Sequence, residues 1–290
     1  MIGRLREALL DLHAKHQADS TLPTNGRFLF YELEMLGLAF KKKDPKAPRG
    51  SMPDADDVSD ALTSLREREE IPWDDIVDET RFINDDTGWL NLADGLLAML
   101  RYNVQLDYWS RSYPLILTES RSLAGTLRPL SDEYRALLAA TNGQCTGFFH
   151  TKVKPFLDRG VIGNVLYLGD HDKAGNDIEA HSRKTVEKIR GVDWLSWQRL
   201  AVTEDQVALY GLTPIDKVDT RYRPHRKYKA VECEALSQKL IFDIVREKLE
   251  ELLPEPLPSV LTREEKQRQL LEAAITAALR NPMVARHFDT

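Results

Sequence analysis

The sequence contains little cysteine and no long hydrophobic run. Only Cys145 and Cys233 occur among 290 residues, too few for a disulfide framework, so we expect a reduced, cytoplasmic protein. No apolar stretch approaches the roughly 20 residues that cross a bilayer, which argues against a membrane protein. The first residues are charged and lack a continuous apolar segment, and we therefore expect no secretion signal there.

The sequence also lacks internal repeats, low-complexity segments and an excess of positive charge. The formal net charge is −6, with 42% hydrophobic and 30% charged residues. Such a composition is typical of ordinary globular chains, and the length suits two domains. Because the net charge is negative, contacts with nucleic acid would depend on local clusters of basic residues.

Two clusters of basic residues are candidates for binding phosphates. The first begins with three consecutive lysines at 41–43, and the second spans residues 221–229, where Tyr222, His225 and Tyr228 alternate with basic side chains. Basic segments with interleaved aromatics can bind phosphates and stack on bases. A solvated loop is the commoner explanation for a charge run, but the second cluster lies within the segment where the acidic residues described below are expected.

The N-terminal part of the sequence is predicted to be helical. Apolar residues at helical spacing predict a helix over residues 2–17, and capping residues with suitable charges predict two more over 27–38 and 54–70. Residues 41–53 between the last two form a basic loop with Pro and Gly. Because helix, loop and helix at this scale resemble a winged-helix or helix-turn-helix module, we assign residues 1–110 to a helical domain that binds DNA.

From about residue 114 the pattern changes to short apolar strands separated by helices. Strands are expected near residues 115–118, 164–168, 197–202 and 228–233. This alternation is typical of a parallel α/β sheet, so we assign residues 111–253 to an α/β domain with a mostly parallel, Rossmann-like sheet. Residues 254–290 begin with a proline-rich linker and are predicted to form a helical tail.

Three acidic residues follow two of these strands. Asp170 and Asp172 come just after an apolar strand, and strand residues two positions apart point to the same side, so both carboxylates can face one point. Glu119 follows the earlier strand in the same way. Ligands of open α/β sheets bind beyond the carboxyl ends of the strands, where close carboxylates repel each other without a cation. For an isolated Asp-x-Asp, an N-cap and a solvated turn are an equally good explanation.

This arrangement resembles the Toprim domain, the metal-binding core of topoisomerases, primases and several nucleases. The resemblance lies in Glu119, Asp170, Asp172 and Gly175, with an apolar strand before each acidic site. It implies that the three acids bind Mg²⁺ or Mn²⁺, with water and a phosphate oxygen completing the coordination shell. The ion would stabilise charge on the scissile phosphate, while Glu119 shares the ion or transfers a proton.

Residues 24–31, Thr-Asn-Gly-Arg-Phe-Leu-Phe-Tyr, are similar to the Arg-x-x-Tyr-Tyr stretch in the winged helix of the topoisomerase VI A subunit. There the second tyrosine attacks a DNA phosphate. Tyr31 matches that tyrosine, Phe30 replaces the first one, and Arg27 would stabilise the phenolate or the phosphate. A core aromatic of a small helical domain is the commoner role for a tyrosine in such a segment.

Residues 71–81 and 214–221 look like segments of a bacterial and phage group that joins a winged helix to a topoisomerase-VI-like Toprim domain. Many members have Lys directly after the Toprim Glu, where this chain has Ser120, followed by Arg121. Acidic residues at 216, 219, 232 and 234 are more simply explained as ion-pair partners of nearby Lys and Arg than as ligands of a second ion. The predicted DNA-binding residues are Lys41, Lys42, Lys43, Arg121, Arg221, Arg223, Arg226 and Lys227.

These features together predict a metal-dependent DNA-cleaving enzyme, either a hydrolytic nuclease or a tyrosine transesterase. The resemblance implies a homodimer, and since no ATPase domain is recognisable, ATP-driven strand passage would need a separate ATPase subunit. One alternative is a catalytically inactive DNA-binding subunit of a larger topoisomerase-like or defence complex, and another is an enzyme that acts on RNA. Retention of all three acids argues against an inactive subunit, because unpaired carboxylates in a crevice destabilise a fold.

Overall fold

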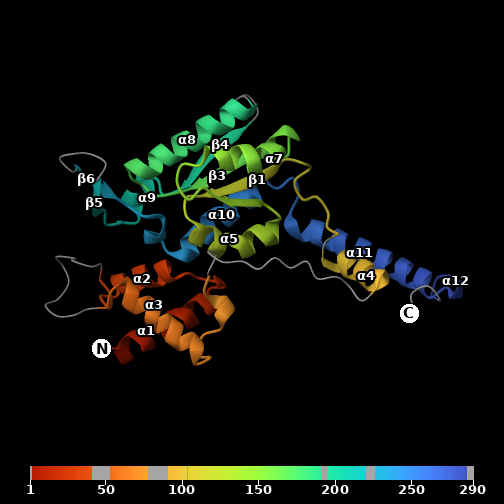
Figure 1. Ribbon diagram of the computed structural model, residues 1–290, viewed down its shortest axis with the longest axis horizontal. Coiled ribbons are helices and arrows are strands. Elements are labelled where there is room, and N and C mark those ends of the chain that lie inside the picture. The colour runs from red at the N-terminus through yellow and green to blue at the C-terminus, as the bar shows by residue number, and fades with distance from the viewer. Residues whose placement is uncertain are drawn as a thin grey trace. The chain divides into compact units, whose positions relative to one another are not determined.

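The computed structural model describes residues 2–40, 53–77, 91–102, 104–190, 195–219 and 226–285 (Figure 1). Contacts between Cα atoms divide the chain into two compact units. One unit comprises Met1–Arg81 with Ser112–Lys248, and the other comprises Phe82–Arg111 with Leu249–Thr290. These bounds differ from the divisions expected after residues 110 and 253, which stay a prediction.

Three helices form the N-terminal part of the first unit. They are α1 (Ile2–Ala18), α2 (Gly26–Met35) and α3 (Ala55–Glu67), followed by the 3₁₀ turn η1 (Trp73–Asp75). The three helices confirm the helical prediction for this segment, with ends shifted by a few residues. Their apolar faces bury a common core that includes Leu9, Leu29, Leu33 and Leu65. Within the described residues of this N-terminal part, the β-pairing consists of an isolated bridge between Thr24 and Ile76. The winged-helix assignment stays a prediction.

A parallel four-stranded sheet forms the rest of the first unit. Its strands lie in the order β2-β1-β3-β4, and every neighbouring pair is parallel. The bounds are β1 (Tyr113–Thr118), β2 (Leu137–Ala140), β3 (Ile162–Leu168) and β4 (Ser196–Ala201). The prediction of a parallel α/β sheet is therefore confirmed. Strand β2 escaped prediction because four residues, Leu-Leu-Ala-Ala, show no alternation of apolar and polar side chains.

Helices cover both faces of this sheet. They are α5 (Arg121–Tyr134), α6 (Thr146–Phe148), the π-helical turn η2 (Phe149–Val153), α7 (Lys154–Asp158) and α8 (Lys173–Arg190). Helix α5 leads from β1 to β2 and α8 leads from β3 to β4, in opposite directions across the sheet. Right-handed crossovers therefore place them on opposite faces, and Figure 1 shows the strands between α8 and α5. One face packs Leu117 and Tyr167 against Phe149 and Leu157.

The remaining strands form a separate hairpin. Strands β5 (Ile215–Asp219) and β6 (Arg226–Ala230) pair antiparallel with each other and form their own two-stranded sheet. The expectation that the strand near residues 228–233 joins the parallel sheet is therefore wrong. An apolar–polar alternation identifies a strand but does not determine which strand it pairs with. Helix α9 (Glu204–Leu209) precedes the hairpin, and the 3₁₀ turn η3 (Cys233–Ala235) follows it.

Helix α10 (Gln238–Leu252) completes the first unit and continues into the second. The second unit contains α4 (Leu92–Tyr102), α11 (Leu257–Leu279) and α12 (Pro282–Ala285). An ion pair between Arg101 and Glu272 joins α4 to α11 within it. None of the helices that the structure describes has both the length and the hydrophobicity needed to span a membrane.

Gln238 provides a test of how the N-terminal helices are attached within the first unit. Its fully buried amide donates to the carbonyl oxygens of Thr21 and Pro23 and accepts from the Thr24 hydroxyl at 2.5 Å. Gln238→Ala should lower the free energy of unfolding by about 2–4 kcal/mol, since it leaves buried polar groups without partners. Urea denaturation measures the loss. Lys239→Ala, an exposed neighbour, should cost at most about 0.5 kcal/mol, and equal losses in both variants would contradict this role.

Candidate active site

Glu119 lies beside the end of β3 because of the parallel pairing between β1 and β3. Its backbone N–H donates to the carbonyl oxygen of Leu168 at 2.9 Å. Its side-chain Oε2 accepts a hydrogen bond from the backbone N–H of Asp170 at 3.1 Å. Glu119 and Asp170, which are 51 residues apart, thus meet at the carboxyl edge of the sheet, where open α/β sheets bind ligands.

The carboxylates of Asp170 and Asp172 are each held by a backbone N–H on one oxygen. Asp170 Oδ1 accepts from Cys233 N at 3.0 Å, and Asp172 Oδ1 accepts from Gly175 N at 2.7 Å. The second contact is an N-cap of α8, so the capping role considered for this motif is present. The other oxygen of each carboxylate faces the same atom, Lys217 Nζ, at 3.3 Å and 3.1 Å. These two oxygens, Asp170 Oδ2 and Asp172 Oδ2, therefore point to one position.

Gly175 allows the first turn of α8 to approach the acids. A Cβ atom at this position would lie 2.3 Å from the carbonyl oxygen of Asp170 and 3.2 Å from Glu119 Oε2. The first distance is impossible for a real Cβ, so any side chain here would push α8 away from the end of β3. Glycine is consequently required by the close approach of two backbone segments.

Lys217 is a site residue that the sequence did not identify. It lies on β5, and its Nζ contacts Asp170, Asp172 and, at 3.5 Å, Glu232 Oε1. Burial lowers the pKa of its ammonium, but the nearby charge of Asp170 and its contacts with Asp172 outweigh burial and leave the pKa raised. The sequence signal for Lys217 is the segment 214–221, whose resemblance implies no chemical role for this lysine.

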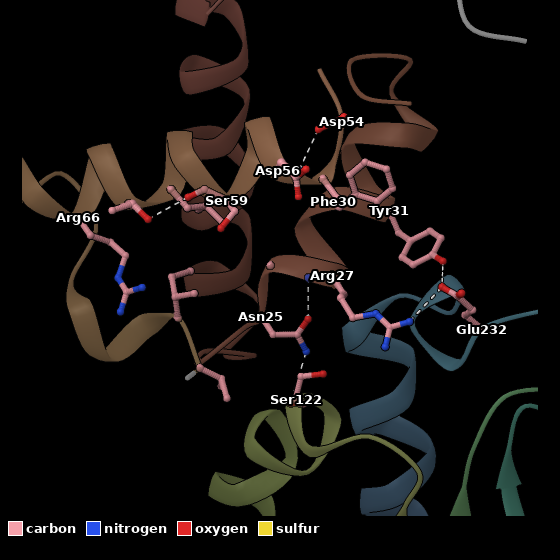
Figure 2. A pocket seen from close by; sticks show the side chains of 16 residues that line it. Asn25, Arg27, Phe30, Tyr31, Asp54, Asp56, Ser59, Arg66, Ser122 and Glu232 are labelled. Carbon is pink, nitrogen blue, oxygen red and sulfur yellow. Dashed lines mark hydrogen bonds and ion pairs between the residues drawn. The ribbon is translucent and has the colours of Figure 1, made fainter. Parts of the chain in front are cut away.

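Tyr31 and Arg27 lie on α2 and face Glu232 (Figure 2). The Tyr31 hydroxyl donates to Glu232 Oε2, and Arg27 Nη2 donates to the same oxygen at 3.1 Å. Glu234, which is buried, lies 3.4 Å from Arg27 Nη1. Burial lowers the pKa of Arg27, but Glu234 and Glu232 outweigh it and leave the pKa raised. Both glutamates form ion pairs, but the partner that they share is Arg27, about 200 residues earlier in the chain, and not one of the adjacent Lys and Arg residues expected from the sequence.

Asn25 fixes the start of the helix that carries Tyr31. Its Oδ1 accepts from the backbone N–H groups of Arg27 and Phe28, which caps α2. Its Nδ2 donates to the Thr126 hydroxyl on α5 at 2.9 Å. The buried amide of Asn25 thus caps the first turn of α2 and attaches this helix to α5.

A cavity of about 790 Å³ opens beside Tyr31. Helices α2 and α3 form most of its wall, together with residues 76–77, Ser122 and Glu232. Figure 2 shows the Arg27 and Tyr31 side chains directed toward Glu232 at one end of it. The described residues that line the cavity do not include Glu119, Asp170 or Asp172, so the acids and the cavity meet through Glu232 and its contact with Lys217.

The predicted DNA-binding residues are only partly covered by the structure. Arg121 begins α5 and is exposed, and Lys227 on β6 is also exposed. The backbone of Arg226 belongs to β6. Lys41, Lys42, Lys43, Arg221 and Arg223 lie outside the described residues. Their role in binding DNA stays a prediction.

The carboxyl group of Glu119 titrates in an unusual range. Burial and the neighbouring charge of Asp170 raise its pKa from 4.5 to about 7. Between these values the folded protein holds a proton on Glu119 that the unfolded chain has lost. The free energy of unfolding contributed by this group therefore falls as the pH rises from 4.5 to 7.

Replacing this carboxyl should stabilise the metal-free fold in a pH-dependent way. Between pH 5 and pH 8, the free energy of unfolding of Glu119→Gln should rise relative to the wild type by about 1–2 kcal/mol, reduced from the full linkage value because solvent partly screens the group. Urea denaturation with a chelator present measures this. Glu67→Gln, at an exposed position on α3, should show no such trend. If the free energies of unfolding of Glu119→Gln and wild type differ by the same amount at every pH, the Glu119 carboxylate is not destabilised in the folded state.

Comparison with known proteins does not place the chain in a family. No protein-family model matches it, and no curated protein or solved structure matches it either. Its function must therefore be inferred from the arrangement of Glu119, Asp170 and Asp172 with the side chains around them.

Proposed function

We propose that the protein cleaves phosphodiester bonds of DNA with the help of a divalent cation. The proposal is carried by two contacts at the carboxyl edge of the parallel sheet: Glu119 accepts a hydrogen bond from the backbone N–H of Asp170, and the carboxylates of Asp170 and Asp172 share Lys217. Burying several acids together is unfavourable unless cations compensate them. Such clusters occur where catalysis or cation binding requires them.

The aspartates have donor atoms that suit Mg²⁺ or Mn²⁺. Mg²⁺ is usually bound by one or two carboxylates, with water and phosphate oxygens completing its shell. Asp170 and Asp172 each turn one oxygen toward the ammonium of Lys217, so a cationic atom is accommodated between them. Within the part of the chain that the structure describes, no three Asp, Glu, His or Cys side chains lie together in a group that could hold a metal ion. Asp170 and Asp172 would therefore hold the ion with water and phosphate oxygens, and the ion would neutralise charge at a scissile phosphate.

Glu119 is the candidate for proton transfer at this site. With a pKa raised to about 7 by burial and by Asp170, it exchanges a proton readily near neutral pH. Asp170 and Asp172 have backbone donors on one oxygen each, which fix their orientation. The basic residues predicted from the sequence would orient the DNA through its phosphates.

Two chemical routes fit this site, and the position of Tyr31 favours one of them. In hydrolysis, an activated water attacks the phosphate and no tyrosine is needed. In transesterification, the phenolic oxygen of Tyr31 attacks and becomes covalently linked to DNA. Tyr31 reaches the acids through Glu232 and Lys217, which supports transesterification. A homodimer and a separate ATPase subunit belong to this proposal through the resemblance to topoisomerase VI.

A plasmid-cleavage assay tests the proposal and separates the routes. Wild-type protein should cut supercoiled DNA with Mg²⁺ or Mn²⁺, and Glu119→Ala should lower the rate by about 10²–10⁴-fold. Tyr31→Phe should abolish cutting together with protein-linked DNA ends if the tyrosine attacks, and should leave cutting intact if water attacks. Tyr210→Phe, at an exposed position, controls for loss of a phenol. Tight duplex binding without cutting would instead support a non-enzymatic DNA-binding subunit, and cleavage of RNA alone would redirect the proposal to that substrate.

Lys217 provides a test of cation binding that does not depend on activity. With a chelator present, Lys217→Ala should lower the free energy of unfolding by about 1–3 kcal/mol, because buried Asp172 loses its counter-charge. Millimolar Mg²⁺ or Mn²⁺ should restore much of this loss, since the ion replaces the ammonium. Lys229→Ala breaks only the exposed pair with Asp216 on the same hairpin and should show neither effect. If the ions stabilise wild type and Lys217→Ala equally, the aspartates are not the binding site.

A further inference from the structure

We propose that Glu232 is the catalytic base that removes the phenolic proton of Tyr31. The inference rests on the proposed function in its transesterification form and adds a residue that neither the acidic motif nor the resemblance identifies. Glu232 touches the reacting oxygen itself, since its Oε2 accepts the hydrogen bond of the Tyr31 hydroxyl. Contact between nucleophile and base is the first geometric requirement of such a pair.

Hydrogen bonds fix the backbone on both sides of Glu232. Val231 and His171 exchange two backbone hydrogen bonds, at 2.8 Å and 3.1 Å. On the other side, the Cys233 N–H donates to Asp170 Oδ1 at 3.0 Å. The carboxylate of Glu232 is therefore held against the segment that carries the two aspartates, and its side chain is only 14% exposed. A base positioned in this way needs little reorganisation before the proton moves.

Two cations orient the carboxylate of Glu232 from opposite sides. Arg27 Nη2 lies 3.1 Å from Oε2, the oxygen that faces Tyr31, and Lys217 Nζ lies 3.5 Å from Oε1. Arg27 cannot accept a proton, because a guanidinium stays protonated in proteins. Its role beside the phenol is to stabilise the negative charge that develops on the tyrosine oxygen. Of Glu232 and the two cations that contact it, Glu232 alone can take the proton.

The proposed step is balanced in protons and electrons. The O–H bond of Tyr31 breaks and the proton moves to Glu232 Oε2. The phenolic oxygen then forms a bond to phosphorus, and the bond from phosphorus to the deoxyribose oxygen breaks. That oxygen leaves with the electron pair and takes a proton from water. In phosphoryl transfer, a carboxylate can accept the proton of a hydroxyl nucleophile.

The phenol of Tyr31 is accessible to a substrate. Tyr31 is half-buried and, with Arg27 and Glu232, lines the cavity of about 790 Å³. Figure 2 shows the tyrosine ring at the wall of this cavity with its hydroxyl toward Glu232. A phosphate beside Arg27 would therefore have the phenolic oxygen within reach.

The pH dependence of covalent-complex formation tests the inference. Glu232→Gln should slow formation of the Tyr31–DNA link by about 10²–10⁴-fold at pH 7, and this deficit should shrink about tenfold per pH unit as solvent generates the phenolate. A DNA substrate with sulfur as the bridging leaving atom should not rescue the variant, since sulfur removes the need for an acid but not for a base. Glu234→Gln, which weakens contacts with Arg27 and Ser120 but keeps Glu232 beside the phenol, should give a deficit of equal size at every pH. A pH-independent deficit in Glu232→Gln, or rescue by sulfur, overturns the assignment.

A second readout needs no cleavage. An aryl sulfonyl fluoride reacts with tyrosines whose protons are removed by a nearby base, and peptide mass spectrometry locates the label among the nine tyrosines. Tyr31 should be labelled at pH 7, about tenfold more slowly in Glu232→Gln and at an undiminished rate in Glu67→Gln, at an exposed position on α3. Equal labelling in wild type and Glu232→Gln overturns the inference. If labelling of Tyr31 depends on Glu232 but the protein never cuts nucleic acid, the result supports the Tyr31–Glu232 pair and refutes the proposed function.

Discussion

The compensation of buried negative charge is the interaction on which the rest of the site depends. Parallel strands bring Glu119 and Asp170 into hydrogen-bonding distance, and Asp172 follows two residues later. In a partly dehydrated crevice such proximity is costly, and the cost is visible as the raised pKa of Glu119. The chain offsets it with the ammonium of Lys217, brought in from a different sheet. The β5–β6 hairpin therefore forms part of the site.

The sequence predicted the acidic centre because its geometry follows from local rules. An apolar run of four residues before Asp170, and another before Glu119, suffice to predict two strand ends. In a parallel sheet such ends lie at one edge. Gly175 was predicted through the resemblance to the Toprim domain, and the structure shows its local reason, the close approach to the carbonyl oxygen of Asp170. These features require no knowledge of which distant segment packs nearby.

Lys217 and Glu232 could not be found in the same way, because their roles depend on long-range packing. In the sequence, Glu232 is one acid among basic neighbours. In the structure, it contacts Arg27 and Tyr31, about 200 residues away. Strand β5 has only five residues, Ile-Asp-Lys-Val-Asp, and its partner cannot be read from its alternation. The mistaken placement of the strand near residue 228 in the parallel sheet has the same cause. Local periodicity defines elements, but charge pairing between them is a property of the folded chain.

The charge balance of the assembled site gives a physical reason to expect a further cation. Five carboxyl groups gather there, those of Glu119, Asp170, Asp172, Glu232 and Glu234, and they face two cationic side chains. Burial and the charge of Asp170 raise the pKa of Glu119 to about 7, which removes part of the excess near neutral pH. What remains is still negative, and it is concentrated where two aspartate oxygens point to one position. A divalent ion with a bound phosphate would balance that charge better than a single lysine can, because it brings two positive charges and releases the ammonium to Glu232 or to the substrate.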